Sequence, residues 1–482
     1  MAKYSYDKIE RMIFEEEDFE KLKVQRNGRT LEFAYFVFEY FFTIMGIPVS
    51  KDIFLREPKN EDISTKLIFD QDEDNDLVFA PNNRIAFCFK CRRKLDDSEL
   101  RLGRRIIEEY LKFSMFRFDV SNRQNTYKSL LVAQRNYELA IQMGVCDWIF
   151  GEQIDENNRV GRLISELEKW SVKTYEGRSV TFGFLVNRDL VLGDDACDYI
   201  DFIHDDYSAT ISDCINSIIE IDKYGRLSKY HSITENDSIN EVVLNPKVPY
   251  RFAHVLSEYV TGNKVGIFLL NNGDIVLSEK GKIMFVKRNL RWLNLSYEGF
   301  EAAINTVYGD MKDELKESIY GSMLDVSFSH IGGIIAVIRD MEQVRQSEED
   351  MLANIDDIQY LAGLPDEYKI IEEELAKNDS ERDISKRVQK RRIIKNLVGT
   401  KMFEQIDRKL RAELIAMDGA CIMDSDGTMR SFGAIIKNNS GSSGGGRGAA
   451  AKKLSQFGFA VKISTDGYIE MYVDGVEIYA VK

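Results

Sequence analysis

The sequence has few cysteines and few histidines. Its 482 residues include six cysteines and four histidines. Cys88 and Cys91 form a C-x-x-C motif, but no second motif of this kind and no histidine pair completes the spacing of a zinc site. We interpret the two residues as separate buried or surface thiols. Because the sequence has no disulfide framework, we expect the protein in the reducing cytoplasm.

An excess of positive charge is also absent. Lysine and arginine number 65, whereas aspartate and glutamate number 80, so the formal net charge is −15. A surface this acidic repels phosphate backbones at long range. We therefore expect no nucleic-acid polymer as a partner, although a local basic pocket could still accept one nucleotide.

The sequence lacks an apolar segment that would export or anchor a protein. Residues 1–21 are charged throughout and contain no apolar signal-peptide core. The most apolar stretch, residues 31–49, contains Glu32 and Glu39 and is at the lower length limit for a membrane span. Its rings recur at helical spacing, which predicts a buried core helix rather than an aromatic ligand cage. We expect no membrane partner.

The length predicts about three domains. Residues 1–155 mix helical and strand patterns and show no chemical motif, and residues 51–76 read as a polar, loop-rich segment. Residues 156–305 are richer in strand signals and form the second expected domain. Its apolar runs are at 180–185, 264–270 and 282–286, and residues 271–274 are a turn signal between the second and the third run.

The third expected domain, residues 312–482, begins with a helix pattern from Leu315 to Val326. A short apolar run at 331–338 predicts a buried strand. A charged, helix-rich insertion is expected at 341–416. The chain then closes with strand patterns at 420–423, 428–437, 459–463, 468–473 and 476–481.

Three features of the C-terminal region could carry chemistry. Asp418 and Gly419 precede an apolar strand, where a carboxylate at a turn can lie close to a ligand. Ser464 opens a Ser-Thr-Asp-Gly segment between two strand patterns. On its own, Asp-Gly is usually just a turn, and a hairpin turn is sufficient to explain the Ser464 segment.

The third feature is the glycine-rich stretch 438–454, which leads into an Ala/Lys helix with Arg447 at the junction. It reads either as a flexible linker or as a phosphate loop. Free N–H groups at a helix start and an arginine suit phosphate oxygens. The stretch is not a P-loop, because no Gly-Lys-Ser/Thr follows.

The order of these motifs resembles the diadenylate cyclase (DAC) domain family. That family has an apolar Gly-Ala-Leu-Ile-Val-Ile-like strand, an Asp-Gly-Ala motif, a Gly-Thr-Arg-His-Arg-Ala-Ala motif and a Ser-Glu-Glu-Thr-Gly-like turn. The resemblance covers residues 312–482. Residues 174–178 also resemble the sensor domains that precede some of these cyclase domains.

The resemblance implies an α/β fold, with a mixed-sheet cyclase domain and flanking helices at the C-terminus, preceded by α+β sensor-like domains. It implies a nucleotidyltransferase that condenses two ATP into cyclic di-AMP, a second messenger, under control of a sensor with an unknown ligand. A face-to-face homodimer or higher oligomer and Mg²⁺ or Mn²⁺ as cofactor follow from the same resemblance.

By this resemblance, Asp418 is a catalytic and metal-binding residue, and Arg447 is a catalytic residue that contacts phosphate. Nucleotide-binding positions carried over are Gly419, Ala420, Gly446, Gly448 and Ser464. Gly448 and Ala449 replace the family's histidine and second arginine. The sequence therefore leaves a second function open: a degenerate, non-catalytic nucleotide-binding regulatory protein. A structural interaction protein with a Gly/Ser linker is a third interpretation.

Overall fold

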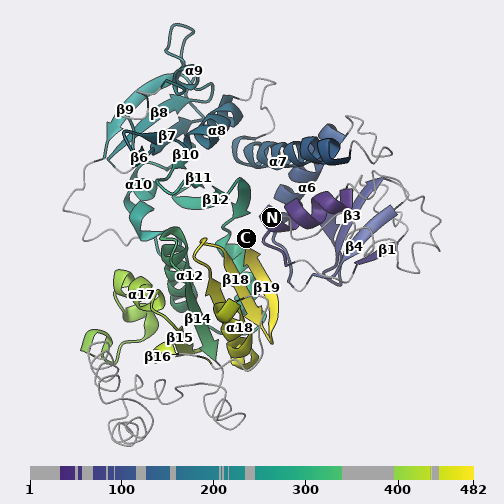
Figure 1. Cartoon of the computed structure of the whole chain (residues 1–482), viewed down its shortest axis with the longest axis vertical. Helices are drawn as coiled ribbons and strands as arrows, with labels where there is room; N and C mark the ends of the chain where they lie inside the picture. The colour runs from purple at the N-terminus through teal and green to yellow at the C-terminus, as the bar shows by residue number, and fades with distance from the viewer. Residues whose placement is uncertain are drawn as a thin grey trace, which may run out of the picture. The chain divides into compact units, whose positions relative to one another are not determined.

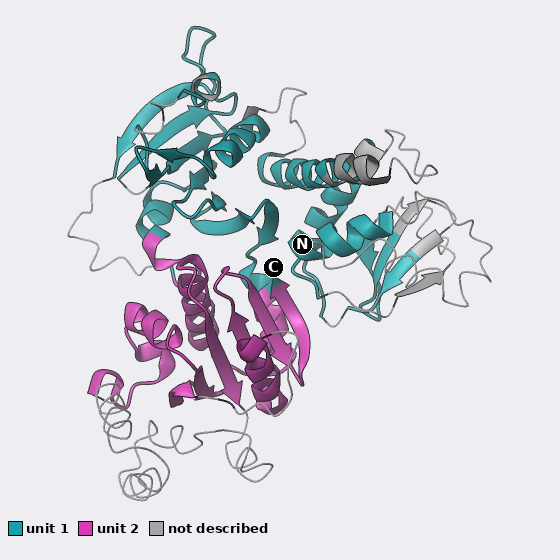
Figure 2. Cartoon of the chain, in the orientation of Figure 1, with its two compact units in different colours: residues 1–245, 252–299, 481 teal, residues 246–251, 300–480, 482 magenta. Residues whose placement is uncertain are grey.

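The computed structural model describes most of the chain as two compact units with a mixed α/β fold. The described residues are 33–48, 53–56, 69–82, 85–91, 93–114, 126–151, 159–205, 208, 211–214, 216–233, 245–338, 396–434, 436 and 445–482. Unit 1 comprises residues 1–245, 252–299 and 481, and unit 2 comprises residues 246–251, 300–480 and 482 (Figure 2).

The first part of unit 1 is a four-stranded antiparallel sheet accompanied by helices. Its strand order is β1-β4-β3-β2, with β1 at Ile53–Arg56, β2 at Phe69–Gln71, β3 at Leu77–Asn82 and β4 at Ile85–Phe89. The expectation of a loop-rich segment at residues 51–76 is therefore wrong for β1 and β2. These strands are only four and three residues long, and the charged residues around them hide the strand pattern.

The apolar segment predicted as a core helix is helical and buried. It contains η1 (Val37–Phe41) and α4 (Phe42–Ile44). Burial is not confined to one face of the helix, because Phe38 and Phe42 are buried as well as Phe41 and Ile44. Edge-to-face ring pairs such as Phe42 with Phe89 fix the segment against the sheet. No described helix is long and apolar enough to cross a membrane.

The second part of unit 1 is a seven-stranded sheet of order β13-β12-β11-β10-β7-β8-β9. β7 pairs with β8 in parallel, and the other neighbours are antiparallel. The strands are β7 Phe182–Asn187, β8 Ser217–Asp222, β9 Leu227–Ser232, β10 Lys264–Leu269, β11 Ile275–Glu279, β12 Lys282–Arg288 and β13 Arg291–Asn294. Strands predicted near 180–185, 264–270 and 282–286 are confirmed, as is the turn before β11.

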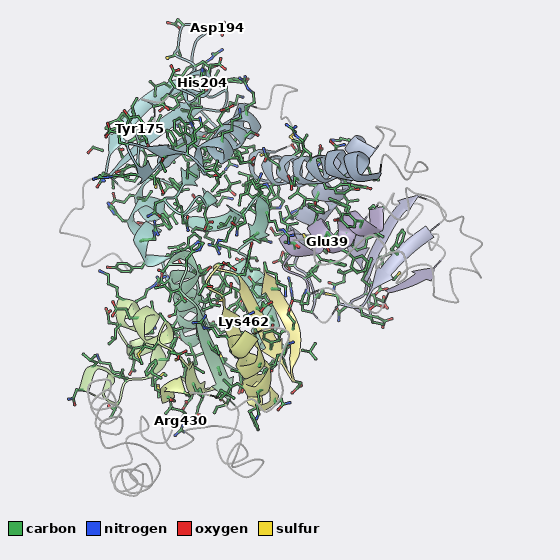
Figure 3. All side chains as sticks on the ribbon, viewed as in Figure 1. Glu39, Tyr175, Asp194, His204, Arg430 and Lys462 are labelled. Atoms are coloured by element: carbon green, nitrogen blue, oxygen red, sulfur yellow. The ribbon has the colours of Figure 1, made fainter. Side chains whose placement is uncertain are left out.

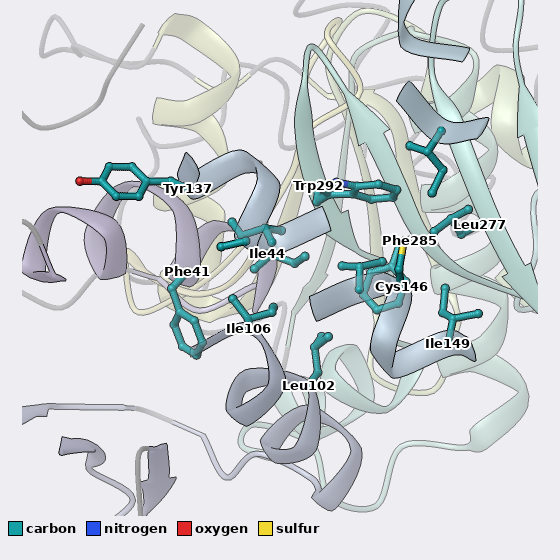
Figure 4. Packing of buried hydrophobic residues seen from close by; sticks show 14 of the residues in the cluster. Phe41, Ile44, Leu102, Ile106, Tyr137, Cys146, Ile149, Leu277, Phe285 and Trp292 are labelled. Carbon is teal, nitrogen blue, oxygen red and sulfur yellow. The ribbon is translucent and has the colours of Figure 1, made fainter. Parts of the chain in front are cut away.

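Helices join the two parts of unit 1 into one apolar core. Figure 4 shows side chains of this core from the apolar segment, from α6 and α7, and from strands β11 to β13. α7 also contacts the sheet through polar groups, since the Lys287 ammonium donates to Gln142 Oε1 at 2.9 Å. Further described helices of unit 1 are α6 Asp97–Ser114, α7 Thr126–Phe150, α8 Arg159–Trp170, α9 Tyr199–Phe202, α10 Ala253–Glu258 and the start of α11 Tyr297–Asn305, while η5 Tyr250–Phe252 is at the boundary between the two units.

Residues 174–178, the segment likened to a sensor domain, form a small hairpin of β5 (Thr174–Tyr175) and β6 (Arg178–Ser179). Its turn residues Glu176 and Gly177 both have positive φ. This conformation matches the tight hairpin turn that favours glycine at its second position.

Unit 2 contains a six-stranded mixed sheet of order β16-β15-β14-β17-β18-β19. β14 pairs with β15 in parallel and with β17 in the antiparallel sense. The strands are β14 Gly333–Ile338, β15 Ala420–Asp424, β16 Met429–Ala434, β17 Gly458–Ile463, β18 Ile469–Val473 and β19 Val476–Val481. All six strands predicted in this region are confirmed, whereas residues 341–395 of the predicted helical insertion lie outside the described residues.

Helices lie on both faces of this sheet (Figure 1). α18 (Gly445–Leu454) packs on the face that presents Ile334, Ala336 and Ala460, and its Ala451 is part of that core. α12 (Asp313–Phe328) and α17 (Arg408–Ile415) pack near the opposite face. A short 3₁₀ turn, η6 (Phe403–Gln405), precedes α17, and another, η7 (Ser455–Phe457), follows α18.

Candidate functional site

The sheet register of unit 2 brings the sequence-predicted residues to the same end of the central strands β14, β15 and β17. We call this end of the sheet the candidate edge. In the parallel pair β14–β15, Ile335 pairs with Cys421, so the start of β15, which follows Asp418 by two residues, lies beside the start of β14. In the antiparallel pair β14–β17, Gly333 faces Ile463. The start of β14, the start of β15 and the end of β17 are therefore neighbours, and Asp418 and Ser464 flank the same edge.

Arg447 reaches this edge from α18. A Cβ atom built on Gly332 would lie 2.4 Å from Arg447 Nη1 and 2.7 Å from its Cζ. No side chain could occupy that space while the guanidinium stays in place. The absence of a side chain at Gly332 thus lets the guanidinium lie directly on the backbone at the start of β14, while Arg447 itself is exposed.

Asp418 and Gly419 form the turn between α17 and β15. Asp418 is exposed. Gly419 has a φ of 105°, and a Cβ at this position would lie 2.4 Å from the backbone carbon of Gly433. Only glycine accommodates both the dihedral angle and the close approach of β16. Ala420, the next residue, is buried in β15 and belongs to the core rather than to an exposed ligand surface.

Ser464 takes the geometry of a hairpin turn. Its backbone N–H donates to Tyr468 O at 2.8 Å, and Tyr468 N–H donates to Ser464 Oγ at 3.1 Å. The carbonyl of Ser464 accepts from Gly467 N–H at 2.9 Å. The ordinary-turn interpretation accounts for these bonds. Ser464 lies at the candidate edge because it directly follows β17, and not because its side chain makes a special contact there.

The glycines of the Arg447 motif differ in burial. Gly446 is exposed in the first turn of α18, and a Cβ there would meet nothing within 4 Å. Gly448 is buried, and a Cβ there would lie 4.0 Å from Lys462 Nζ. Lys462 is on β17, labelled in Figure 3. An ammonium group thus lies near the position at which the cyclase family has its histidine.

Lys462 belongs to a polar cluster beneath α18. Its ammonium group is 2.5 Å from Glu470 Oε2, and Lys482 Nζ is 2.8 Å from Glu470 Oε1. Tyr472 donates its hydroxyl to Glu470 Oε2 at 3.0 Å. Burial alone would raise the pKa of Glu470, but Lys482 and Lys462 outweigh that effect and lower it to about 2. Burial and the Glu470 charge both raise the pKa of Tyr472.

The donor set limits which metal arrangement the site could accept. Among the described residues, no group of three or more histidine, cysteine, aspartate or glutamate side chains is placed to hold a metal ion. Asp418 offers one exposed carboxylate at the candidate edge. This set fits an ion such as Mg²⁺ that takes its remaining ligands from substrate phosphates and water. The C-x-x-C pair is divided, with Cys88 buried and Cys91 donating its thiol to Arg93 O at 3.2 Å.

No family model matches this chain, and no curated protein matches it. Sequence reasoning found Asp418, Arg447 and Ser464, but it did not find Lys462 or the contact between Arg447 and Gly332. A lysine inside an apolar strand pattern (Gly-Phe-Ala-Val-Lys-Ile) was the available signal for Lys462, because a charged residue on a core-facing position needs a partner.

Proposed function

We propose that unit 2 is a nucleotidyltransferase that binds ATP at the edge formed by Asp418, Arg447 and Ser464. The observation that carries the proposal is the shared edge, since the register of β14 with β15 and β17 brings together motifs that are distant in sequence. The contact between Arg447 and Gly332 puts a cation at that edge. The motif order that resembles diadenylate cyclases supports the same reaction.

The proposed reaction joins two ATP molecules into cyclic di-AMP. Each 3′-hydroxyl oxygen bonds to the α-phosphorus of the other ATP, the bond to pyrophosphate breaks, and the hydroxyl proton is released. The Arg447 guanidinium and the N–H groups at the start of α18 bind phosphate oxygens. Gly419 lines the ribose, and Gly446 and Ser464 belong to the nucleotide-binding surface, whereas Ala420 and Gly448 are buried and are assigned no ligand contact.

Asp418 is assigned to the 3′-hydroxyl or to a metal ion. Mg²⁺ or Mn²⁺, when bound with ATP, would neutralise phosphate charge and favour loss of the hydroxyl proton. The protein itself holds the Asp418 carboxylate at a rigid turn. The turn is rigid because the backbone of Gly419 packs against the backbone of Gly433. Each copy supplies one such edge, so the reaction needs two copies facing each other.

Lys462 is the candidate replacement for the positive charge that the altered motif lacks. Gly448 and Ala449 remove a histidine and an arginine relative to the resembled family, and charge stabilisation at phosphate carries most of such catalysis. Lys462 Nζ lies beside Gly448 and could supply part of the missing charge. Its pairing with Glu470 weakens that contribution, because the carboxylate already neutralises the ammonium group.

A second candidate function is nucleotide binding without turnover. The observation that favours it is the same pairing of Lys462 with Glu470, because it neutralises the ammonium group that would otherwise assist Arg447 in binding phosphate at the candidate edge. In this case unit 2 would act as a regulatory module in which ATP or cyclic di-AMP is a ligand. Both functions require Arg447, and only the first requires product formation.

Incubation of the purified full-length protein with ATP and Mn²⁺, followed by chromatography and mass spectrometry, tests the first function. We expect cyclic di-AMP from the unaltered protein and from Glu413→Gln, which removes an exposed carboxylate elsewhere in unit 2. We expect none from Asp418→Asn. Equal product from Asp418→Asn and Glu413→Gln would contradict the assigned site.

Calorimetry with ATP and cyclic di-AMP tests the second function. Arg447→Ala should weaken binding of both ligands, whereas Lys401→Ala, which removes an exposed cation of the same unit, should leave it unchanged. Binding without product would select the regulatory function. Failure to bind either ligand would reject both functions.

A further inference from the structure

Unit 1 contains an open cavity that the proposed function does not use. Its volume is about 960 Å³, within the range of small-molecule sites. It is lined by the start of α6, the C-terminal end of α7, the end of β7 and the β11–β12 turn. These elements belong to one compact unit and share one apolar core.

The charge of the cavity is opposite to the charge of the chain. Six basic side chains line it against three carboxylates, although the whole chain carries −15. A local surplus of positive charge in a cleft raises the local concentration of anions, even on a protein that is acidic overall. The cavity therefore favours an anionic ligand.

Pairing within the lining identifies the cations that remain for a ligand. Glu279 is bonded to Arg188 at 2.5 Å, and Glu108 is 3.4 Å from Arg105. Within the described part of the chain, neither Arg101 nor Lys280 has an ion-pair partner, and both are exposed. These two residues approach the cavity from different elements, α6 and the β11–β12 turn.

Two further basic side chains that line the cavity form weak, exposed ion pairs. Arg104 is 3.1 Å from Asp70, and Lys282 is 3.2 Å from Glu298. Exposed pairs of this kind contribute little free energy, so a ligand phosphate can compete for them. Arg101, Arg104 and Arg105 share one face of α6 because their spacing is three and four residues.

The cavity also has an apolar side. Trp148 and Phe150, both half-buried, line it together with Ile149 and Met284. The Trp148 ring is fixed edge-to-face against Phe285, with centroids 5.5 Å apart. A fixed, partly exposed aromatic ring beside arginines offers a surface for a flat ring and a charged group on the same ligand.

Hydrogen bonds hold the walls in place before any ligand arrives. Arg188 donates to Asn263 O at 3.1 Å and also to Ile149 O, which ties the end of α7 to the sheet. At the start of α6, Asp96 Oδ1 accepts from the N–H groups of Ser98 and Glu99. A preformed cavity avoids the entropic cost of ordering its lining.

We propose that this cavity binds a nucleoside phosphate, with the phosphates at Arg101, Arg104 and Lys280 and the base against Trp148. Guanidinium groups bind phosphate oxygens in pairs, and the volume accommodates both a ring system and a phosphate chain. The site is in unit 1 and shares no residue with the edge at Asp418 and Arg447, so its failure and that of the proposed function are separate outcomes.

Tryptophan fluorescence of the full-length protein provides a local readout. All three tryptophans are in unit 1, and Trp170 and Trp292 are only 2% and 3% exposed, so a bound base should mainly affect Trp148. Titration uses ADP, adenosine and pyrophosphate. The protein carries Asp418→Asn and Arg447→Ala, which removes the proposed site in unit 2.

We expect saturable quenching by ADP and a dissociation constant that rises with ionic strength. Arg101→Glu with Lys280→Glu should raise that constant about tenfold or more, since each change reverses a charge at the cavity. Lys229→Glu, an exposed charge reversal on β9 outside the cavity, is the matched control. Circular dichroism checks that each variant is folded, and Arg101→Gln gives a milder second test.

Four results would overturn the proposal. They are no saturable quenching by ADP, an equal constant for the reversed and control variants, adenosine binding as tightly as ADP, and pyrophosphate binding as tightly as ADP. The third result would show that the phosphates contribute nothing to affinity. The fourth would show that the base contributes nothing and that the site binds inorganic anions only.

Discussion

At the scale of single residues, the position of the Arg447 guanidinium depends on an absent side chain. Gly332 leaves the space that the guanidinium fills at the start of β14. Gly419, by contrast, is required for the backbone itself, because its φ is 105°. Two glycines at one edge therefore have different roles: one admits a functional group, and the other allows a turn.

A Gly332→Ala substitution should displace Arg447 with little loss of stability. The clash is with the end of a flexible side chain, which can move. We expect ATP affinity to fall several-fold in calorimetry, and we expect no further loss when Gly332→Ala is combined with Arg447→Ala, because both act on one interaction. Additive losses from the two substitutions would show that Gly332 acts by another route.

Glu470 should make the stability of the α18 face depend on acid pH. Lys482 and Lys462 lower its folded pKa from 4.5 to about 2 despite burial. Between these values the unfolded state binds more protons than the folded state, so this contribution is present above pH 4.5 and is lost as the pH falls toward 2. Hydrogen exchange of β17 and β18, corrected for intrinsic rates, measures the loss.

The matched variants for this measurement are Glu470→Gln and Asp474→Asn. Glu470→Gln should lower protection above pH 4.5 and remove its dependence on pH in this window. Asp474 is an exposed turn residue, so Asp474→Asn should retain the dependence. The same pH profile in both variants would contradict the assignment to Glu470.

At the scale of elements, sequence patterns predicted the strands of unit 2 but not their order. Short apolar or alternating runs bounded by turn residues identify β14 to β19, and each is observed. The parallel pairing of β14 with β15 joins segments that are about eighty positions apart. No local pattern encodes such a pairing, so the sequence joined Asp418 and Ser464 in one site only through the resemblance to cyclases.

The aromatic segment at residues 33–44 illustrates the same limit in unit 1. Its spacing predicted a helix with one buried face, yet rings on several faces are buried. The sequence showed the helical period but not the neighbours, which include α6, α7 and the four-stranded sheet. The amount of surface that a helix buries depends on those distant partners.

A Gly419→Ala substitution should destabilise the β15–β16 pair. Alanine at a φ of 105° is strained, and its Cβ would lie 2.4 Å from the Gly433 backbone, which cannot move as a side chain can. We expect a loss of about 2 kcal/mol or more in the free energy of unfolding by denaturant. Gly309→Ala, where a Cβ meets only ordinary contacts, should have a much smaller effect. Equal effects would contradict this account.

At the scale of the whole molecule, the sequence predicted three blocks, and the structure has two compact units. The helices α6 and α7, in the first predicted block, share a core with strands of the second. Composition and turn signals mark where the pattern changes along the chain, but they do not reveal which segments pack together. The main segment of unit 2 begins at residue 300, close to the start of the region that resembles a cyclase.

The measurement that tests the central claim most directly is the rate of cyclic di-AMP formation as a function of protein concentration. One copy offers one edge with Asp418 and Arg447, and the proposed reaction needs two edges facing each other. We predict product from ATP with Mn²⁺, and a rate per protein molecule that rises with concentration until the dimer is fully formed. A rate per molecule that is independent of concentration down to nanomolar protein, or no product at any concentration, would contradict the account.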